Sequence, residues 1–350
     1  VLIKGTRIAA TGSADILRAQ APQATVHDHG NRLILPGFVD AHVHYPQTAI
    51  IASWGKRLID WLNTYTFPEE RKFGDPAYAA TIHPASVDAF FQAAADRDMR
   101  VVAGKTCMDR NAPDTLRDTA QSAYDDSKAL LTRWHGTGRA HYAITPRFSP
   151  TSTPDQLEAL GALWAEHPDC LMQTHLSEQV DEIAWVRDLY PNARDYLDTY
   201  EAHGLLGARG VYGHAIHMEP REVNRLAGLA ARGISVGLAT DTGGGSSFSM
   251  LRTMAAAYEI GQLRGTPLHA RHLLWLATAG SARSLHLHDR IGTLAAGYDA
   301  DICVLDLAST PAIAQRAANV SDIWEAVFAT IMMGDDRAVA QVWVNGRMVG

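Results

Sequence analysis

The sequence predicts an α/β protein, a (β/α)8 barrel of the TIM type with a small β-sandwich domain built from both termini. Short apolar runs alternate with helix-like segments through the middle of the chain, and most of these runs end on polar residues. Both ends of the chain are instead rich in short strands with turn signals. Alternation alone is typical of a barrel or of a doubly wound sheet, because both bury parallel strands under helices.

Six apolar runs are the predicted strands, at residues 33–44, 99–109, 139–149, 169–178, 209–217 and 233–241. Helical patterns cover residues 153–168 and 86–98, with Thr153 and Ser86 as expected N-caps and Gln156 as the capping-box partner of Thr153. A closed barrel needs eight strands. Since the pattern lacks room for two of them, we hypothesise that segments are absent near 80/81 and near 226–229.

The two ends of the chain are predicted to form one small β-sandwich domain, from residues 1–36 and 290–350. Residues 344–347 read Val-Asn-Gly-Arg, a strong signal for a β-hairpin turn. Residues 37–289 then form the barrel domain. This division assigns the alternating pattern, and with it the chemistry, to the central part of the chain.

Composition narrows the classes of function. The chain has 350 residues, 47% hydrophobic and 20% charged, which is enough for a sizeable core. A net charge of −7 without a basic run argues against nucleic acid or an anionic membrane as the partner. We find neither an apolar run of membrane-spanning length nor a signal-peptide pattern. Three widely spaced cysteines fit a reducing compartment, so we expect a cytoplasmic protein.

Histidines and an aspartate follow several predicted strands, namely His42 and His44, His175, and Asp241. The carboxyl ends of barrel strands converge on one rim, and residues i and i+2 of a strand share a face. We therefore predict that these four side chains bind one metal ion. By itself, the His42–His44 pair could equally be exposed or packed histidines. Three histidines and one aspartate suit zinc, with iron or another divalent ion as the alternative.

Several motifs resemble those of a known family. The segments PGFVDAHVH, THLSE, GHAIH and ATDTGGG resemble the amidohydrolase superfamily of metal-dependent deaminases and hydrolases. Within it, HVHYPQ at 42–47 and the stretches at 60–70, 105–114 and 145–152 resemble guanine deaminases. The likeness extends from residue 33 to about residue 300. It implies hydrolysis of guanine, a small-molecule purine, to xanthine and ammonia, one zinc ion per chain, and a homodimer.

The resemblance also implies roles for single residues. It assigns the metal to His42, His44, His175 and Asp241, and the contacts to the purine to Gln47, Arg147, Phe148 and His214. Glu178 is implied as the proton shuttle, which protonates the ring nitrogen N3 and then helps ammonia to leave, and a raised pKa would help it. His214 is implied to orient the attacking water, and Asp241 can accept its proton.

Other interpretations stay open. The substrate could be another aminated heterocycle, such as 8-oxoguanine, a pterin or a triazine. The chain could also be a non-catalytic metal-binding protein of the same fold. A phosphate loop at residues 240–247 is rejected, because the segment lacks the lysine of such loops. Lys105 resembles the modified lysine of two-metal amidohydrolases, but its surrounding KTCMD matches the deaminase pattern, so we predict one metal.

Overall fold

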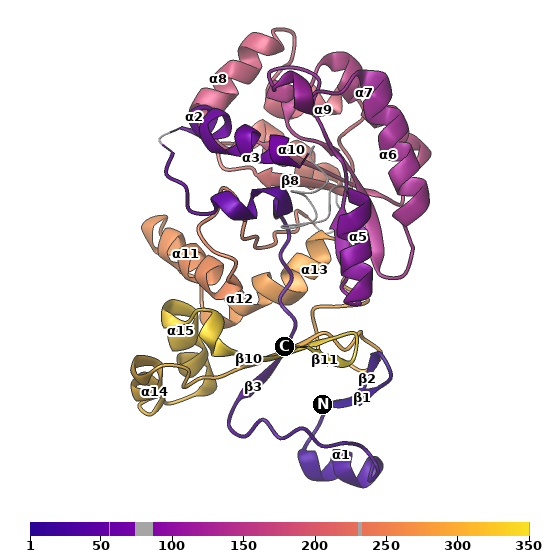
Figure 1. Ribbon diagram of the computed structural model, residues 1–350. Coiled ribbons are helices and arrows are strands. Elements are labelled where there is room, and N and C mark those ends of the chain that lie inside the picture. The colour runs from indigo at the N-terminus through magenta and orange to yellow at the C-terminus, as the bar shows by residue number, and fades with distance from the viewer. Residues whose placement is uncertain (56, 74–86, 230–232, 350) are drawn as a thin grey trace. The chain divides into compact units, whose positions relative to one another are not determined.

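The computed structural model describes residues 1–55, 57–73, 87–229 and 233–349 (Figure 1). The chain forms two compact units. The first consists of Val1–Val43 with Ser235–Gly350, and the second of His44–Ile234. Among the described residues no helix is long and apolar enough to cross a membrane.

A parallel sheet is the centre of the second unit. Its order is β4-β6-β7-β8, with β5 also paired to β6. Four of the six predicted runs supply these strands, which are β4 (Val101–Ala103), β5 (Thr106–Cys107), β6 (Ala140–Pro146), β7 (Leu171–Leu176) and β8 (Gly210–His214). Neighbouring strands are parallel throughout. The strands of this unit therefore form half of a barrel, and their carboxyl ends share one edge.

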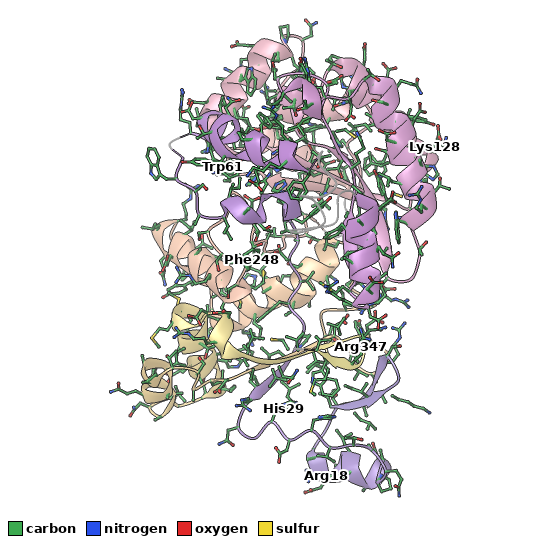
Figure 2. The ribbon with its side chains drawn as sticks, viewed as in Figure 1. Arg18, His29, Trp61, Lys128, Phe248 and Arg347 are labelled. Carbon is green, nitrogen blue, oxygen red and sulfur yellow. The ribbon has the colours of Figure 1, made fainter. Side chains whose placement is uncertain are left out.

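Helices cover this sheet and close a core around it. Fully buried side chains of the core include Tyr142 on β6, Met172 on β7 and Leu160 on α7. Lys128 projects from α6 (Figure 2) and pairs with Glu166 of α7 at 2.7 Å. The helices of this unit are α2 (Leu58–Trp61), α3 (Phe67–Lys72), α5 (Val87–Asp96), α6 (Ala120–Trp134), α7 (Pro154–Glu166), α8 (Val180–Leu189), α9 (Tyr196–Glu201) and α10 (Pro220–Leu229), with π-helical or 3-10 turns at Tyr45–Ile50, Leu62–Thr66, Asp114–Leu116 and Ser149–Thr151.

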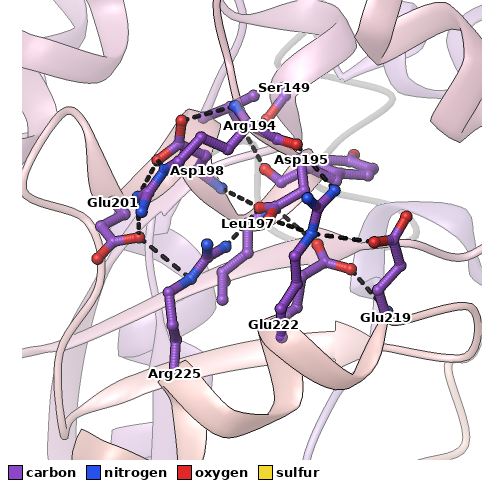
Figure 3. A network of polar contacts seen from close by, with 12 residues as sticks. Ser149, Arg194, Asp195, Leu197, Asp198, Glu201, Glu219, Glu222 and Arg225 are labelled. Atoms are coloured by element: carbon purple, nitrogen blue, oxygen red, sulfur yellow. Dashed lines mark hydrogen bonds and ion pairs between the residues drawn. The ribbon is translucent and has the colours of Figure 1, made fainter.

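Ion pairs fasten α9 to α10 (Figure 3). Asp195 caps α9, is buried, and pairs with both Arg225 and Arg221 of α10. The backbone N–H of Leu197 donates to Glu222 at 3.1 Å. α10 continues as a helix to Leu229, so the described residues at 226–229 contain no strand, and the hypothesis of an absent segment there stays a prediction. The other expected gap, at 80/81, lies outside the described residues.

Thr153 caps α7 as predicted. Its hydroxyl oxygen accepts a hydrogen bond from the backbone N–H of Gln156 at 3.3 Å, and its own N–H donates to Asp109 at 2.7 Å. The predicted reciprocal bond from Gln156 is wrong. The Gln156 side chain is fully buried, and neither of its amide atoms has a hydrogen-bond partner among the described residues. Ser86, the other predicted cap, lies outside those residues.

Replacing Thr153 by alanine is expected to lower the free energy of unfolding by about 1–2 kcal/mol, because the hydroxyl that caps α7 also donates to the Asp109 carboxylate and both bonds are lost, while the backbone N–H bond to Asp109 remains. Urea denaturation followed by circular dichroism measures this change. Thr132→Ala is the matched control, since Thr132 is exposed on α6 and its hydroxyl donates to the backbone carbonyl of Lys128, four residues back in the same helix. Equal losses in the two variants would contradict the capping role.

The first unit joins strands from both ends of the chain, as predicted. Its four-stranded antiparallel sheet has the order β11-β10-β9-β3, and β1 pairs with β2 in a separate hairpin. Asn345 and Gly346 connect β10 to β11 with positive φ angles of 52° and 80°, which confirms the predicted turn. The elements are β1 (Leu2–Lys4), β2 (Arg7–Ala10), α1 (Ala14–Gln20), β3 (Leu33–Pro36), α11 (Met250–Leu263), α12 (Ala270–Trp275), a π-helical turn (Leu276–Gly280), α13 (Ser281–Ser284), β9 (Ile302–Leu305), α14 (Pro311–Ala317), α15 (Ile323–Met333), a 3-10 turn (Asp336–Ala338), β10 (Val339–Val344) and β11 (Arg347–Val349).

Two predicted strands are wrong in extent. The run 33–44 is a strand only as far as Pro36, where Gly37 turns the chain by donating its N–H to the Asp301 carbonyl at 2.9 Å. The run 233–241 contains no strand. Instead, the two segments are joined by backbone bonds from Ala41 to Leu238 and from Asp241 to His42, at 3.1 and 3.0 Å. The two segments lie side by side but lack the regular series of backbone hydrogen bonds that defines paired β-strands.

Candidate active site

His44 and His175 present their ring nitrogens to each other in the second unit. Their Nε2 atoms are 3.1 Å apart and their rings are stacked with centroids 5.1 Å apart. His175 lies in β7, one residue before its end, and its Nδ1 lies 2.7 Å from the carbonyl oxygen of Arg147. That carbonyl can only accept a hydrogen bond, so Nδ1 carries the proton and the lone pair is on Nε2.

This arrangement fits a metal ligand pair. Two nitrogen ligands of a tetrahedral zinc ion, each about 2.0–2.1 Å from the metal, lie about 3.3 Å apart. The measured separation of 3.1 Å between His44 and His175 is close to this value. A backbone carbonyl that holds the second ring nitrogen of a histidine ligand is also usual in metal sites. The donor chemistry of the pair therefore suits zinc.

His42 and Asp241 form a second pair, in the first unit. His42 Nε2 lies 3.7 Å from Asp241 Oδ1. Asp40, which our sequence reasoning missed, holds the segments that carry them: its carboxylate accepts hydrogen bonds from the backbone N–H of His42 at 3.3 Å and of Thr240 at 3.0 Å. Neither His42 nor His44 lies in a strand, so the prediction that they share a strand face is wrong.

Close backbone packing explains the glycines after Asp241. A Cβ atom added to Gly245 would lie 1.9 Å from the Thr240 carbonyl oxygen, which no other residue type can tolerate. The N–H of Gly245 donates to the Asp241 carbonyl. The TGGG segment thus lets the chain fold back tightly beside Asp241.

Glu178 and His214 meet at the ends of β7 and β8. Glu178 Oε2 is 3.4 Å from His214 Nε2, and both side chains are mostly buried. The centroids of the His214 and His175 rings are 5.4 Å apart. Burial lowers the pKa of His214 to about 4, so its imidazole is neutral at neutral pH. A neutral imidazole beside a carboxyl group can pass or hold a proton.

In the second unit the backbone is left-handed at Ser177, His214 and Ala215, with φ of 50°, 65° and 53°, and in the first unit it is left-handed at Asp241, with φ of 47°. Such conformations cost about 1–3 kcal/mol each for residues other than glycine, and they cluster at functional sites. Ser177 immediately precedes Glu178. In the second unit, this strain aims Glu178 and His214 away from the strand direction that the regular sheet would impose.

Three of the four predicted purine contacts, Gln47, Arg147 and Phe148, lie together in the second unit. Gln47 and Arg147 are buried, and both bind the carboxylate of Glu70, a residue that our sequence reasoning quoted but did not single out. Phe148 is buried, and its ring lies edge-on to His175 with centroids 6.2 Å apart. The signal that could have found Glu70 is the pair of adjacent acids in FPEE, Glu69 and Glu70, which follows an apolar residue on a short helix.

Lys105 has a structural partner. Its ammonium donates to the carboxylate of Asp118, and a second acid, Asp126, is 3.9 Å away. Both acids lie in the segment that leads into or forms α6. An ion-paired lysine is not poised for the carboxylation that a two-metal site requires. The number of metal ions stays a prediction.

The chain matches the amidohydrolase family over residues 33–349, and residues 1–24 match an imidazolonepropionase-like composite domain of bacteria. It is 40% identical to the guanine deaminase of Escherichia coli K12, over all of this chain and 90% of that one. That alignment spans 396 residues whereas this chain has 350, so at least 46 positions inside it have no counterpart here. This difference agrees with the hypothesis of absent internal segments, whose positions stay a prediction.

Solved structures agree with the sequence comparison. An E. coli guanine deaminase structure has a TM-score of 0.96 at 39% identity, covering 100% of this chain and 92% of that one. Guanine deaminase from Bradyrhizobium japonicum has a TM-score of 0.94 at 29% identity, with 99% and 91% covered. The fold is shared with atrazine chlorohydrolase TrzN from Arthrobacter aurescens TC1, complexed with zinc, at 22% identity, a TM-score of 0.80, and 99% and 89% covered. The predicted fold class is thereby confirmed, and the chain belongs to the amidohydrolase family.

Proposed function

We propose that the chain deaminates guanine by hydrolysis, giving xanthine and ammonia. The observation that carries this proposal is the grouping at the ends of β6, β7 and β8. There the His44–His175 pair, which suits a metal, lies near the Glu178–His214 pair and near Gln47 and Arg147, two buried residues that share the carboxylate of Glu70. Family membership and 40% identity to a curated guanine deaminase support the reaction and its substrate.

We propose that His42, His44, His175 and Asp241 hold one divalent ion, zinc in the first place and iron as the alternative. When bound, the ion supplies a Lewis acid that lowers the pKa of water to about 7. Two pairs of these ligands have facing donor atoms, at 3.1 Å for His44 with His175 and at 3.7 Å for His42 with Asp241.

The remaining roles belong to the protein's own side chains. Glu178 carries a proton to N3 of the purine and then assists departure of the amine as ammonia, for which a carboxyl group must both give and take a proton. His214, 3.4 Å from Glu178, orients the water and contacts the purine. Asp241 accepts the proton of the water. Gln47, Arg147 and Phe148 hold the ring, the first two through hydrogen bonds and the third through its aromatic edge.

Ammonia release from guanine tests this proposal, with formation of xanthine followed by ultraviolet absorbance. We expect rapid release from guanine and slow or no release from adenine, cytosine and 8-oxoguanine. Release from 8-oxoguanine, a pterin or a triazine instead would keep the mechanism and move the substrate to the alternative class. No release from any base by the metal-loaded protein would favour a non-catalytic metal-binding role.

Family membership also supports proposals about the metabolic role, the cellular location and the oligomeric state of the protein. A guanine deaminase serves purine catabolism, and we propose a cytoplasmic homodimer whose substrate is a free purine rather than a nucleic acid. We also propose a division into a β domain of residues 1–36 and 290–350 and a catalytic domain of residues 37–289. Sedimentation of the purified protein tests the dimer.

A further inference from the structure

A buried carboxylate, Glu70, joins two residues that come from different segments. Its Oε1 accepts hydrogen bonds from Gln47 Nε2 at 2.8 Å and from Arg147 Nη1 at 3.0 Å, and its Oε2 accepts from the same Nη1 at 2.7 Å. Gln47 and Arg147 are 1% and 5% exposed, and the Glu70 side chain is 13% exposed. Charge-assisted hydrogen bonds of this length, shielded from water, hold both partners in fixed rotamers.

We propose that Glu70 is a positioning residue that sets the hydrogen-bonding pattern by which Gln47 and Arg147 select the substrate. This inference rests on the proposed function. An ionised carboxylate can only accept hydrogen bonds, so the Gln47 amide must turn its NH2 group toward Glu70. The carbonyl oxygen Oε1 of Gln47 is thereby directed elsewhere. It is buried and has no hydrogen-bond partner among the described residues, so it requires a donor.

The pattern that results favours one type of purine edge. Arg147 can only donate, and Gln47 Oε1 can only accept. Guanine offers the carbonyl O6 as an acceptor next to N1–H as a donor. Adenine offers the reverse at the same edge, an amino donor next to the bare N1 acceptor, and would leave buried groups of the site unpaired. Unpaired buried groups are the strongest source of discrimination between similar substrates.

Neighbouring contacts hold Gln47, Glu70 and Arg147 in place. Phe67, on the same helix as Glu70, lies under the guanidinium of Arg147 at 5.5 Å from its ring centroid. Burial, with the negative charge of Glu70, raises the pKa of nearby Tyr45 to about 12, so that phenol stays protonated. The helix that carries Glu70 therefore fixes Arg147 through both an ion pair and an aromatic face.

The test compares guanine with 2-aminopurine, which keeps the C2 amino group but lacks O6 and the N1 proton. In Glu70→Gln we expect kcat/KM for guanine to fall about 10- to 100-fold, mainly through a rise in KM. A loss of this size is what removal of one charge-assisted hydrogen bond typically produces. The Kd of 2-aminopurine, measured by its fluorescence, should change less than about threefold, because that ligand lacks the edge that Gln47 and Arg147 read.

Two further variants guard against a folding defect. Glu70→Asp keeps the charge that compensates Arg147 but withdraws the acceptor by one methylene, so we expect a native melting temperature with the same selective loss for guanine. Glu69→Gln is the matched control, because Glu69 is the adjacent buried acid and pairs with Lys72 at 2.7 Å. It should keep wild-type selectivity.

The outcomes separate the two claims. An active wild-type enzyme whose Glu70 variants lose guanine and 2-aminopurine equally, or lose neither, would overturn the positioning role and leave the proposed function intact. A wild-type protein that does not deaminate guanine would overturn the proposed function and this inference with it. Selective loss of guanine in both Glu70 variants would support the inference.

Discussion

Glu178→Gln is expected to lower kcat for guanine deamination by about 10²- to 10⁴-fold, the usual contribution of a general acid–base group. The substitution preserves the size of the side chain and its 3.4 Å approach to His214 but removes the group that can release and recapture a proton. Ammonia release under saturating guanine measures the effect. Because Glu178 is not a proposed ligand, metal content should stay at the wild-type level.

The control for this variant is Glu219→Gln, an exposed acid shortly after β8 that pairs with Arg221 at 2.9 Å. It should leave kcat unchanged. The pH dependence of kcat gives an independent readout, since titration of the Glu178 carboxyl group should no longer contribute to the profile of Glu178→Gln. A Glu178→Gln enzyme with an intact profile and more than about one-tenth of wild-type kcat would exclude the proton-shuttle role.

His175→Asn is expected to remove both bound metal and activity. Wild-type protein should contain about one zinc per chain by elemental analysis, and the variant far less, because a site of this kind depends on each of its few ligands. Activity should fall by at least about 10³-fold, which corresponds to roughly 4 kcal/mol of transition-state stabilisation. Chelation of wild-type protein should produce the same loss, and added zinc should restore it.

His272→Asn serves as the matched substitution, since His272 is exposed on α12 and lies against Trp275. It should keep wild-type metal content and rate. Elemental analysis distinguishes a variant that has lost its metal from one that has lost activity but kept its metal. If His175→Asn retained its metal, the ligand assignment would be wrong even when activity was lost.

The recurring strands could be predicted in the second unit, where each apolar run packs against helices. The runs that contain β4 to β8 are predictable because each is a continuous apolar stretch, and most residues of β6 and β7 are buried. The strands predicted over 33–44 and 233–241 are wrong in extent. Pro36 and Gly37 divide the first of them, and the second bonds its neighbour at separate points, so neither sustains a ladder. Hydrophobicity predicts burial well, but a strand also needs a partner in register.

Sequence alone determined the inventory of reactive groups: the histidines, Asp241 and Glu178, with the resemblance that ordered them into roles. Residue type limits chemistry, because few side chains bind zinc or transfer protons near neutral pH. Only the tertiary structure decided how these groups are oriented. The Arg147 carbonyl sets the proton of His175, Asp40 ties the segments of His42 and Asp241, and Glu70 turns the Gln47 amide. Each of these partners is distant in sequence from at least one group that it holds, and hydrogen bonds between distant segments leave no periodic pattern to read.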